Sequence, residues 1–200
     1  MKNSWSYPIL FMAIITALFT FVLASLNYST AEKVEFLQDI ELKDKILYVF
    51  DIPTPSDEPE DIDKTFDENI KEEKINGERV FIQEKDGEVV GYAIPTGGAG
   101  LWGSIDAYVG ISADLEHILG LEFIEHSETP GLGGRISEEE YKGQFRDIDI
   151  SSADEGNYII YRPSSGGNVD AITGATLTSE SVRDFLNKDI LKFIEEGEVE

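Results

Sequence analysis

A run of small and hydroxyl-bearing residues, Asp170–Ser179, directly precedes an amphipathic segment, and Thr173, Gly174, Ala175 and Thr176 form its centre. If a helix begins here, its first backbone N–H groups lack partners inside the helix, and its dipole places partial positive charge at this end. Both effects favour a phosphate group beside Thr176. The residue types therefore suit phosphate binding or attachment, although a Thr or Ser ahead of a helix is more often an ordinary N-cap.

The helix expected after this run rests on the spacing of apolar residues. They recur at intervals of three and four, which places them on one side of a helix; they are Val182, Phe185, Leu186, Ile190, Phe193 and Ile194. Glu180 in the first turn is consistent both with a phosphate site and with an ordinary N-cap at the helix start.

Two further segments combine turn residues with backbone that can approach a ligand closely. Gly98–Gly103 has the spacing G-x-G-x-x-G, which in dinucleotide-binding proteins is followed by a helix. A strand-like alternation follows here, so we reject that interpretation and expect the glycines to turn the chain tightly beside a planar ligand. Glu128–Gly133 contains a rigid Pro-Gly turn whose amides can hydrogen-bond such a ligand. The alternative for both is a plain loop, with Trp102 in the core.

The three segments together resemble the FMN-binding domain family of the Rnf and Nqr respiratory complexes. Asp170–Thr176 fits the pattern D-x-x-[ST]-G-A-T, Glu125–Gly134 contains E-T-P-G-L-G, and Gly98–Gly103 reads G-x-G-L-W-G, in the family's order. The resemblance extends from about Asp86 to Ile194 and includes the apolar N-terminal segment.

The resemblance implies that FMN is attached through a phosphoester bond to the side-chain oxygen of Thr176. It also implies that the two other segments line the flavin pocket. The expected cofactor-binding residues are Thr176 with Thr173, Gly174, Ala175, Leu177, Thr178 and Asp170, then Glu128, Thr129, Pro130, Gly131, Leu132 and Gly133, and finally Leu101 and Trp102. We expect no metal and no catalytic side chain, because the flavin carries the chemistry.

The composition narrows the classes of function. A formal net charge of −24 in 200 residues argues against a nucleic-acid partner, which would need basic patches. The absence of cysteine excludes disulfides, thiolate catalysis and cysteine-ligated iron–sulfur clusters, so a redox role needs a carrier such as flavin. His117 and His126 lack metal-ligand spacing. Arg135 and Arg162 could offset a phosphodiester charge, but structural ion pairs are the more frequent role of such residues.

An apolar run near the N-terminus predicts a membrane-spanning helix. No residue from Asn3 to Ala31 is charged, and about 20 apolar residues suffice to cross the hydrocarbon core. Ala24–Leu26 is a poor cleavage site, which favours a retained anchor over a signal peptide. We expect a short cytoplasmic tail over 1–7 and a single crossing of the inner or plasma membrane over 8–28. The soluble domain then lies on the extracytoplasmic side, as the resemblance also implies.

The remaining sequence predicts an α+β fold, a mostly antiparallel sheet flanked by helices. Residues 29–75 are expected to be a connecting segment and residues 76–196 the FMN-binding domain. The connecting segment has a helix over 31–50, an acidic Pro-rich linker over 51–63 and a short helix over 65–75. The domain has an Asp86-Gly87 hairpin turn, a helix over 137–145 and strands over 79–83, 89–94, 104–111, 118–124 and 158–161.

One functional hypothesis follows, with three alternatives. The resemblance implies a membrane-anchored electron-transfer subunit that carries covalent FMN in an ion-translocating Rnf-type ferredoxin:NAD oxidoreductase, with the G subunit of the family preferred. Such a chain is an electron relay rather than the whole enzyme, and its partners are the other membrane subunits and a flavin transferase. The alternatives are the C subunit of a Na⁺-translocating NADH:quinone oxidoreductase of the Nqr type, a different membrane-bound flavoprotein reductase, and a non-redox anchored binding domain.

Overall fold

The structure is a computed structural model that describes residues 6–75, 77–153 and 156–196, and the chain divides into two compact units. The described part of the first unit, Met1–Glu41, is helical and belongs to α1 (Ser6–Val49), so the helix predicted over 31–50 is confirmed. Between Tyr7 and Leu26 most of its large apolar side chains are exposed. Among the described residues, α1 is the one helix long and apolar enough to cross a membrane. The predicted tail over 1–7 lies mainly outside the described residues.

The second unit, Leu42–Glu200, is built around a sheet in which each described strand pairs antiparallel with its neighbour in the sequence. The strands are β1 (Ile70–Ile75), β2 (Glu78–Lys85), β3 (Glu88–Ala99), β4 (Ser104–Ser112), β5 (His117–His126) and β6 (Ile148–Asp149). The predicted α+β class and four of the five predicted strands are confirmed. Asp86 and Gly87 have φ angles of 55° and 84°, the conformation of a tight hairpin turn between β2 and β3.

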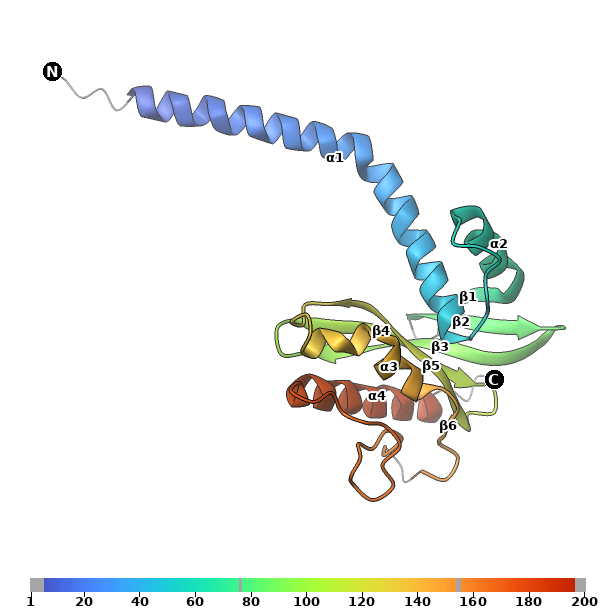
Figure 1. Ribbon diagram of the computed structural model, residues 1–200. Coiled ribbons are helices and arrows are strands. Elements are labelled where there is room, and N and C mark those ends of the chain that lie inside the picture. Colours follow the sequence, from blue (N-terminus) through green and yellow to red (C-terminus); the bar gives the residue numbers. More distant parts are fainter. Residues whose placement is uncertain (1–5, 76, 154–155, 197–200) are drawn as a thin grey trace. The chain divides into compact units, whose positions relative to one another are not determined.

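The two faces of the sheet are covered by different helices (Figure 1). The helix α4 (Thr176–Glu196) packs on one face, where a Cβ on Gly98 of β3 would lie only 3.0 Å from Phe185. On the other face, α2 (Pro59–Asn69) places Phe66 edge-on against Phe81 of β2, with ring centroids 5.8 Å apart. The last turn of α1 packs beside them. Glycine at 98 therefore permits close contact between β3 and the helix that begins at Thr176.

The connection from β5 to α4 contains short helical pieces, η1 (Gly133–Ser137), α3 (Glu139–Lys142) and η2 (Gly143–Phe145), followed by β6 and irregular chain. The helical character predicted over 137–145 is confirmed, but the range is divided into three short pieces. Gly143 directly follows α3, and glycine disfavours continuation of a helix by about 1 kcal/mol relative to alanine. The pieces place Tyr141 and Phe145 in the core beneath the sheet.

Two predictions for the connecting segment are wrong. The acidic linker ends at residue 58, because α2 begins at Pro59, a position where the missing N–H of proline costs nothing. The helix predicted over 65–75 ends at Asn69, and residues 70–75 form the edge strand β1. Its Lys-Glu-Glu-Lys sequence favours a helix locally. The ladder with β2 and cross-strand ion pairs such as Lys71–Glu84 outweigh that preference.

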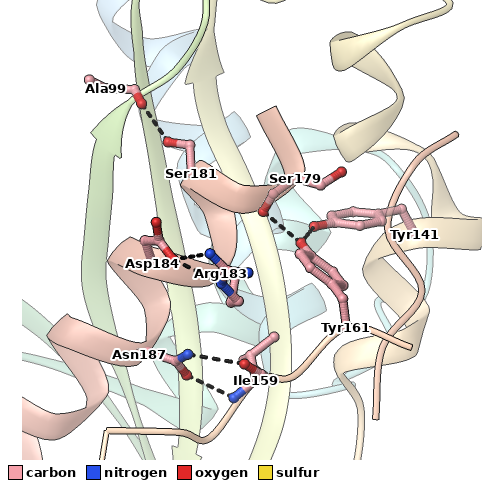
Figure 2. Close-up of polar contacts among 9 residues, drawn as sticks. All are labelled: Ala99, Tyr141, Ile159, Tyr161, Ser179, Ser181, Arg183, Asp184 and Asn187. Carbon is pink, nitrogen blue, oxygen red and sulfur yellow. Dashed lines mark hydrogen bonds and ion pairs between the residues drawn. The ribbon is translucent and has the colours of Figure 1, made fainter. Parts of the chain in front are cut away.

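The strand predicted over 158–161 is also wrong. In the described chain Tyr161 makes only an isolated bridge to Val169. Ile159 instead bonds to the side chain of Asn187, donating from N to Oδ1 over 2.7 Å and accepting at O from Nδ2 over 3.0 Å (Figure 2). A side-chain amide therefore takes the place of a neighbouring strand, while the apolar side chains still reach the core.

Candidate functional site

The hydroxyl-rich run forms a tight turn followed directly by α4. Ala175 N donates to Ile172 O over 3.0 Å, and Gly174 has a φ of 84°, a conformation that favours glycine. The helix begins at Thr176, as predicted, and Ser179 N donates to Ala175 O over 3.0 Å. The backbone N–H groups of residues 176–178 thus precede the first bond of the helical ladder. A helix start with N–H groups of this kind is the geometry that favours a phosphate, and phosphate binding here stays a prediction.

The hydroxyl groups of this run differ in their availability. Thr178 is 1% exposed and donates to Glu128 Oε2 over 2.6 Å. Ser179 is fully buried, and its Oγ accepts from Ile172 N over 3.0 Å. Thr173 and Thr176 are exposed, and among the described residues no hydrogen bond engages either hydroxyl. The fold therefore leaves the side chains of Thr173 and Thr176 accessible to a covalent partner.

Glu128 brings the three predicted motifs together. Its side chain is 5% exposed, and its Oε1 accepts from Leu101 N over 2.7 Å and from Trp102 N over 3.1 Å. Its Oε2 accepts from the Thr178 hydroxyl. One buried carboxylate thus joins the Gly98–Gly103 segment, the Pro-Gly loop and the first turn of α4. Both of its oxygens are engaged by the protein itself.

The Pro-Gly loop is a tight turn that lies beside the hydroxyl-rich run. Leu132 N donates to Thr129 O over 3.1 Å, and Gly131 has a φ of 75°, as expected for a Pro-Gly turn with proline second. A Cβ built on Gly174 would lie 3.7 Å from Leu132 Cδ2, which is ordinary van der Waals contact. The sequence-predicted residues Glu128–Gly133 and Thr173–Thr178 therefore form one contiguous surface.

Exposed apolar side chains gather on this surface. Among the described residues of the second unit, four large apolar side chains have at least half of their surface exposed: Leu101, Trp102, Leu132 and Leu177. All four were predicted to contact the cofactor, and the alternative in which Trp102 fills the core is wrong, because it is 69% exposed. An exposed apolar patch of this kind marks a place where a ligand or partner is expected.

The first turns of α4 are bonded to other parts of the chain by contacts that the sequence did not predict (Figure 2). Tyr161 donates its hydroxyl to Ser179 O over 2.7 Å, and the hydroxyls of Tyr141 and Tyr161 lie 2.7 Å apart. Ser181 donates to Ala99 O at the end of β3. Burial raises the pKa of Tyr161 to about 12 and that of Tyr141 well above its usual value. No motif marks these residues, because they are far apart in the sequence.

Arg135, Arg162 and His126, which the sequence analysis considered, have structural partners. Arg135 Nε lies 3.0 Å from a Glu138 oxygen, and Arg162 Nη1 lies 3.0 Å from an Asp170 oxygen. Both arginines therefore form ion pairs, the more frequent of their two expected roles. His126 Nδ1 accepts from Glu128 N over 3.3 Å, which leaves the proton on Nε2, 2.8 Å from Ser137 Oγ.

The exposed trio Asp114, Glu116 and His117 has ligand atoms within 4.8 Å of one another, a grouping that could hold a metal ion. Asp114 Oδ1 already accepts from Glu116 N over 3.1 Å and from the hydroxyl of Ser112, which accounts for its lowered pKa. The trio lies in the hairpin between β4 and β5 and contains none of the predicted site residues.

A groove in the second unit lies elsewhere on the same helix. Its volume is about 510 Å³, and it runs between strands β3 and β4 and the second half of α4, with Thr96, Asp189 and Lys192 among its lining residues. Its lining includes none of the residues predicted to bind the cofactor.

Comparison with known proteins agrees with the three motifs. Residues 100–190 match the family described as the FMN-binding domain. The G subunit of the ion-translocating oxidoreductase complex of Methanosarcina acetivorans is 38% identical over 107 residues, which cover 54% of the chain and 53% of that protein. The chain thus spans about half the length of this and other relatives that it matches. The G subunit of the Na⁺-translocating ferredoxin:NAD⁺ oxidoreductase complex of Acetobacterium woodii is 30% identical over 192 residues, covering 90% of the chain and 87% of that protein.

A solved structure has the same fold. The C subunit of the Na⁺-translocating NADH-quinone reductase of Parabacteroides distasonis superposes with a TM-score of 0.70 at 24% identity, covering 83% of the chain and 96% of that structure. At this identity the likeness establishes the arrangement of sheet and helices.

Proposed function

Because the chain belongs to the FMN-binding domain family, which includes the G subunits of Rnf complexes and the C subunits of Nqr complexes, we propose that it is the membrane-anchored, FMN-carrying G subunit of an ion-translocating Rnf-type ferredoxin:NAD oxidoreductase. In this role it relays electrons inside a complex whose other membrane subunits are its partners. One observation carries the proposal: Thr176 presents an exposed hydroxyl at the start of α4, beside four exposed apolar side chains.

We assign the FMN attachment to Thr176 by comparing how exposed and how hydrogen-bonded the nearby hydroxyl groups are. Thr178 and Ser179 are buried and engaged, which removes them as acceptors. Thr173 is exposed but precedes the helix, inside the turn that ends at Ala175. Thr176 is exposed and belongs to the first turn of α4, where the N–H groups without helical partners lie. A phosphodiester on Thr176 keeps one negative charge, which the helix start stabilises by about 0.3–1 kcal/mol.

Attachment turns the Thr176 hydroxyl into a phosphodiester and needs an activated donor. A flavin transferase would use a flavin dinucleotide: the Thr176 oxygen bonds to the phosphorus of the FMN half, a P–O bond of the pyrophosphate breaks, and a nucleoside monophosphate leaves. The hydroxyl proton passes to a base of the transferase. The role of this chain is to hold Thr176 exposed and fixed during the reaction.

The bound cofactor supplies reversible electron transfer, and the chain supplies its position and surroundings. Leu101, Trp102, Leu132 and Leu177 would cover the apolar face of the ring system, and each Å² of apolar surface buried stabilises the arrangement by roughly 25 cal/mol. The backbone of the Pro-Gly loop would reach the ring's polar edge. The turn at Gly174 and the helix start would hold the phosphate.

The anchoring and its direction are part of the proposal. Residues 8–28 of α1 are uncharged, mostly apolar and long enough to cross the membrane once, which supports an anchor. The soluble domain is placed on the extracytoplasmic side, with residues 1–7 in the cytoplasm. A reporter fused after Glu200 should be active only outside the cytoplasm, and cytoplasmic activity would refute this orientation.

The assignment to the G subunit is preferred because the match to the Acetobacterium woodii protein covers 90% of the chain. The runner-up is the C subunit of the Nqr type, which the shared fold of the solved Parabacteroides distasonis structure supports. Purification of the native complex separates the two, because the proteins that accompany the chain belong to one complex or the other.

The central experiment is expression of the full chain with and without a flavin transferase. The denatured wild-type chain should show flavin fluorescence on a gel only when the transferase is present. Thr176→Ala should abolish this fluorescence while the protein still accumulates in the membrane, and the matched variant Thr173→Ala should retain it. Fluorescence that survives denaturation in Thr176→Ala, or a wild-type chain that never acquires flavin, would overturn the proposal.

A further inference from the structure

We propose that Glu128 is a positioning residue: its buried carboxylate fixes three chain segments around Thr176 and so presents that hydroxyl for flavin attachment. The inference rests on the proposed function, and it assigns Glu128 a task different from contact with the cofactor. The observation behind it is that both carboxylate oxygens are already occupied by donors of this chain.

The donors come from opposite sides of the site. The N–H groups of Leu101 and Trp102 hold Oε1 from the turn between β3 and β4, and the Thr178 hydroxyl holds Oε2 from the first turn of α4. Thr178 is two residues from Thr176 in the same helical turn, so a fixed Thr178 also fixes the backbone of Thr176. The carboxylate therefore connects the residue to be modified with the apolar side chains expected to meet the ring.

Glycines make room for this carboxylate on two sides. A Cβ on Gly100 would lie 2.5 Å from Glu128 Oε1, and a Cβ on Gly133 would lie 2.4 Å from Oε2 and 2.6 Å from Thr178 Oγ1. All three distances are too short for a Cβ while the Glu128 carboxylate and the Thr178 hydroxyl stay in place. Gly100 and Gly133, one in each of two motifs, are thus explained by the space that Glu128 requires.

The backbone of Glu128 is fixed as well. Its N–H donates to His126 Nδ1, and His126 Nε2 is bonded to Ser137 Oγ in η1. A buried carboxylate is costly unless its oxygens accept hydrogen bonds, and the three donors meet that requirement. Loss of the carboxylate would leave three donors of the site without their acceptor, and the turn at Leu101 and the start of α4 would lose their common anchor.

Two substitutions separate hydrogen bonding from simple packing. Glu128→Gln keeps the shape: its amide oxygen accepts from Leu101 N and Trp102 N, and its amide nitrogen donates to the Thr178 hydroxyl, which then acts as acceptor. Glu128→Ala removes all three bonds. Glu122→Gln is the matched control, because Glu122 is a similarly buried glutamate, 7% exposed, whose partner is Lys142 rather than the site.

The full chain of each variant is produced in membranes together with the transferase, and covalent flavin per chain is measured after denaturation. We expect Glu128→Ala to lose at least about tenfold, the factor equivalent to one hydrogen bond to a charged group. Glu128→Gln should lose less than Glu128→Ala, because it keeps the acceptor of Leu101 N and Trp102 N and gives up only the acceptor of the Thr178 hydroxyl. Glu122→Gln should stay within about twofold of wild type, because it leaves all three bonds of the site in place. Equal losses in Glu128→Ala and Glu128→Gln, or no loss in Glu128→Ala, would overturn the inference.

Amide hydrogen exchange without the transferase tests the same positioning independently of flavin. In Glu128→Ala the amides of Leu101 and Trp102 should exchange faster by about tenfold or more, and those of β5 should be unchanged. Unchanged exchange at Leu101 and Trp102 would overturn the inference. A wild-type chain without flavin would instead refute the proposed function, and the exchange result would still decide the role of Glu128.

Thr178 supplies the second pair of variants if Glu128→Ala does not accumulate. Thr178→Val is nearly isosteric and removes one donor, so covalent flavin should fall, and Thr178→Ser should restore it because the hydroxyl returns. Flavin attachment as high in Thr178→Val as in Thr178→Ser would contradict a positioning role for the Glu128–Thr178 contact.

Discussion

Two buried glutamates in the same sheet-and-helix unit are satisfied in opposite ways. Glu122 on β5 forms a tight ion pair with Lys142, and its Oε1 accepts from Phe123 N over 3.0 Å. Lys142 in turn lies 4.2 Å from the ring centroid of Tyr48, and Arg146 covers the same ring at 4.4 Å. This region uses cations to fasten the end of α1 and the α3–η2 segment to the sheet.

Among the described residues, Glu128 accepts only from uncharged groups, two backbone amides and one hydroxyl. These donors lie on loops and on a helix start, and the apolar side chains beside them are exposed rather than packed. In this chain the buried carboxylate with a cation partner, Glu122, connects elements of the core. The one with amide and hydroxyl donors, Glu128, connects loops that carry exposed apolar side chains. Stability and flavin attachment should therefore respond differently to changes in the two regions.

The largest loss of stability is expected from the cation-paired region. Lys142→Met leaves Glu122 buried without its cation and should lower the free energy of unfolding by about 3–5 kcal/mol. Chemical denaturation of the detergent-solubilised chain measures it. Arg135→Met is the control, because the half-exposed pair with Glu138 is worth about 0–1 kcal/mol. A loss below about 1 kcal/mol for Lys142→Met would show that the Glu122–Lys142 ion pair does not stabilise the fold to this extent.

A smaller loss of stability, accompanied by loss of flavin, is expected from the site. Gly133→Ala forces a methyl group against the Glu128 carboxylate and the Thr178 hydroxyl, and such overpacking costs about 1–3 kcal/mol. Covalent flavin should fall with it. Gly143→Ala is the matched control, because its added methyl would meet only the flexible end of Glu139 at 3.3 Å. Normal flavin content in Gly133→Ala would show that the packing around Glu128 and Thr178 does not affect flavin attachment at Thr176.

Some features of the fold and of the site can be predicted from the sequence, and others cannot. The motifs around Thr176, Pro130 and Trp102 and the short apolar runs of β2 to β5 are local patterns that the sequence shows directly, and Glu128 joins the three motifs in the structure. The Glu128–Thr178 contact spans 50 residues, so spacing gave no sign of it. Two predicted elements were wrong because tertiary contacts outweighed local preference: the Lys-Glu-rich β1 pairs with the neighbouring strand β2, and Asn187, 28 residues away, bonds the backbone of Ile159.

The smallest expected effect concerns the tyrosines beneath the start of α4. Burial raises the pKa of Tyr161 to about 12 in the folded chain, above the ordinary value of about 10 expected on unfolding. As the pH rises, the unfolded chain therefore loses the Tyr161 proton before the folded chain does. The contribution of this group to the free energy of unfolding is intact below pH 10 and is lost as the pH rises toward 12. Tyr161→Phe should cost about 0.5–1.5 kcal/mol at neutral pH and should make the fall above pH 10 shallower.

Denaturation curves at intervals of pH measure this effect, and Tyr158→Phe is the comparison, since Tyr158 is also buried but lies outside the contact to Ser179. An equally steep alkaline fall in Tyr161→Phe would show that this hydroxyl does not contribute to the pH dependence.

The central claim is that FMN is bound through the Thr176 side chain, and mass mapping of the proteolysed chain tests it most directly. The full chain, produced with a flavin transferase, is digested and its peptides are fragmented. Our account predicts one modified peptide, heavier by one FMN minus water, with the added mass on Thr176. The same mass on Thr173 or Thr178, or its absence from the peptide containing residues 170–179, would contradict the account.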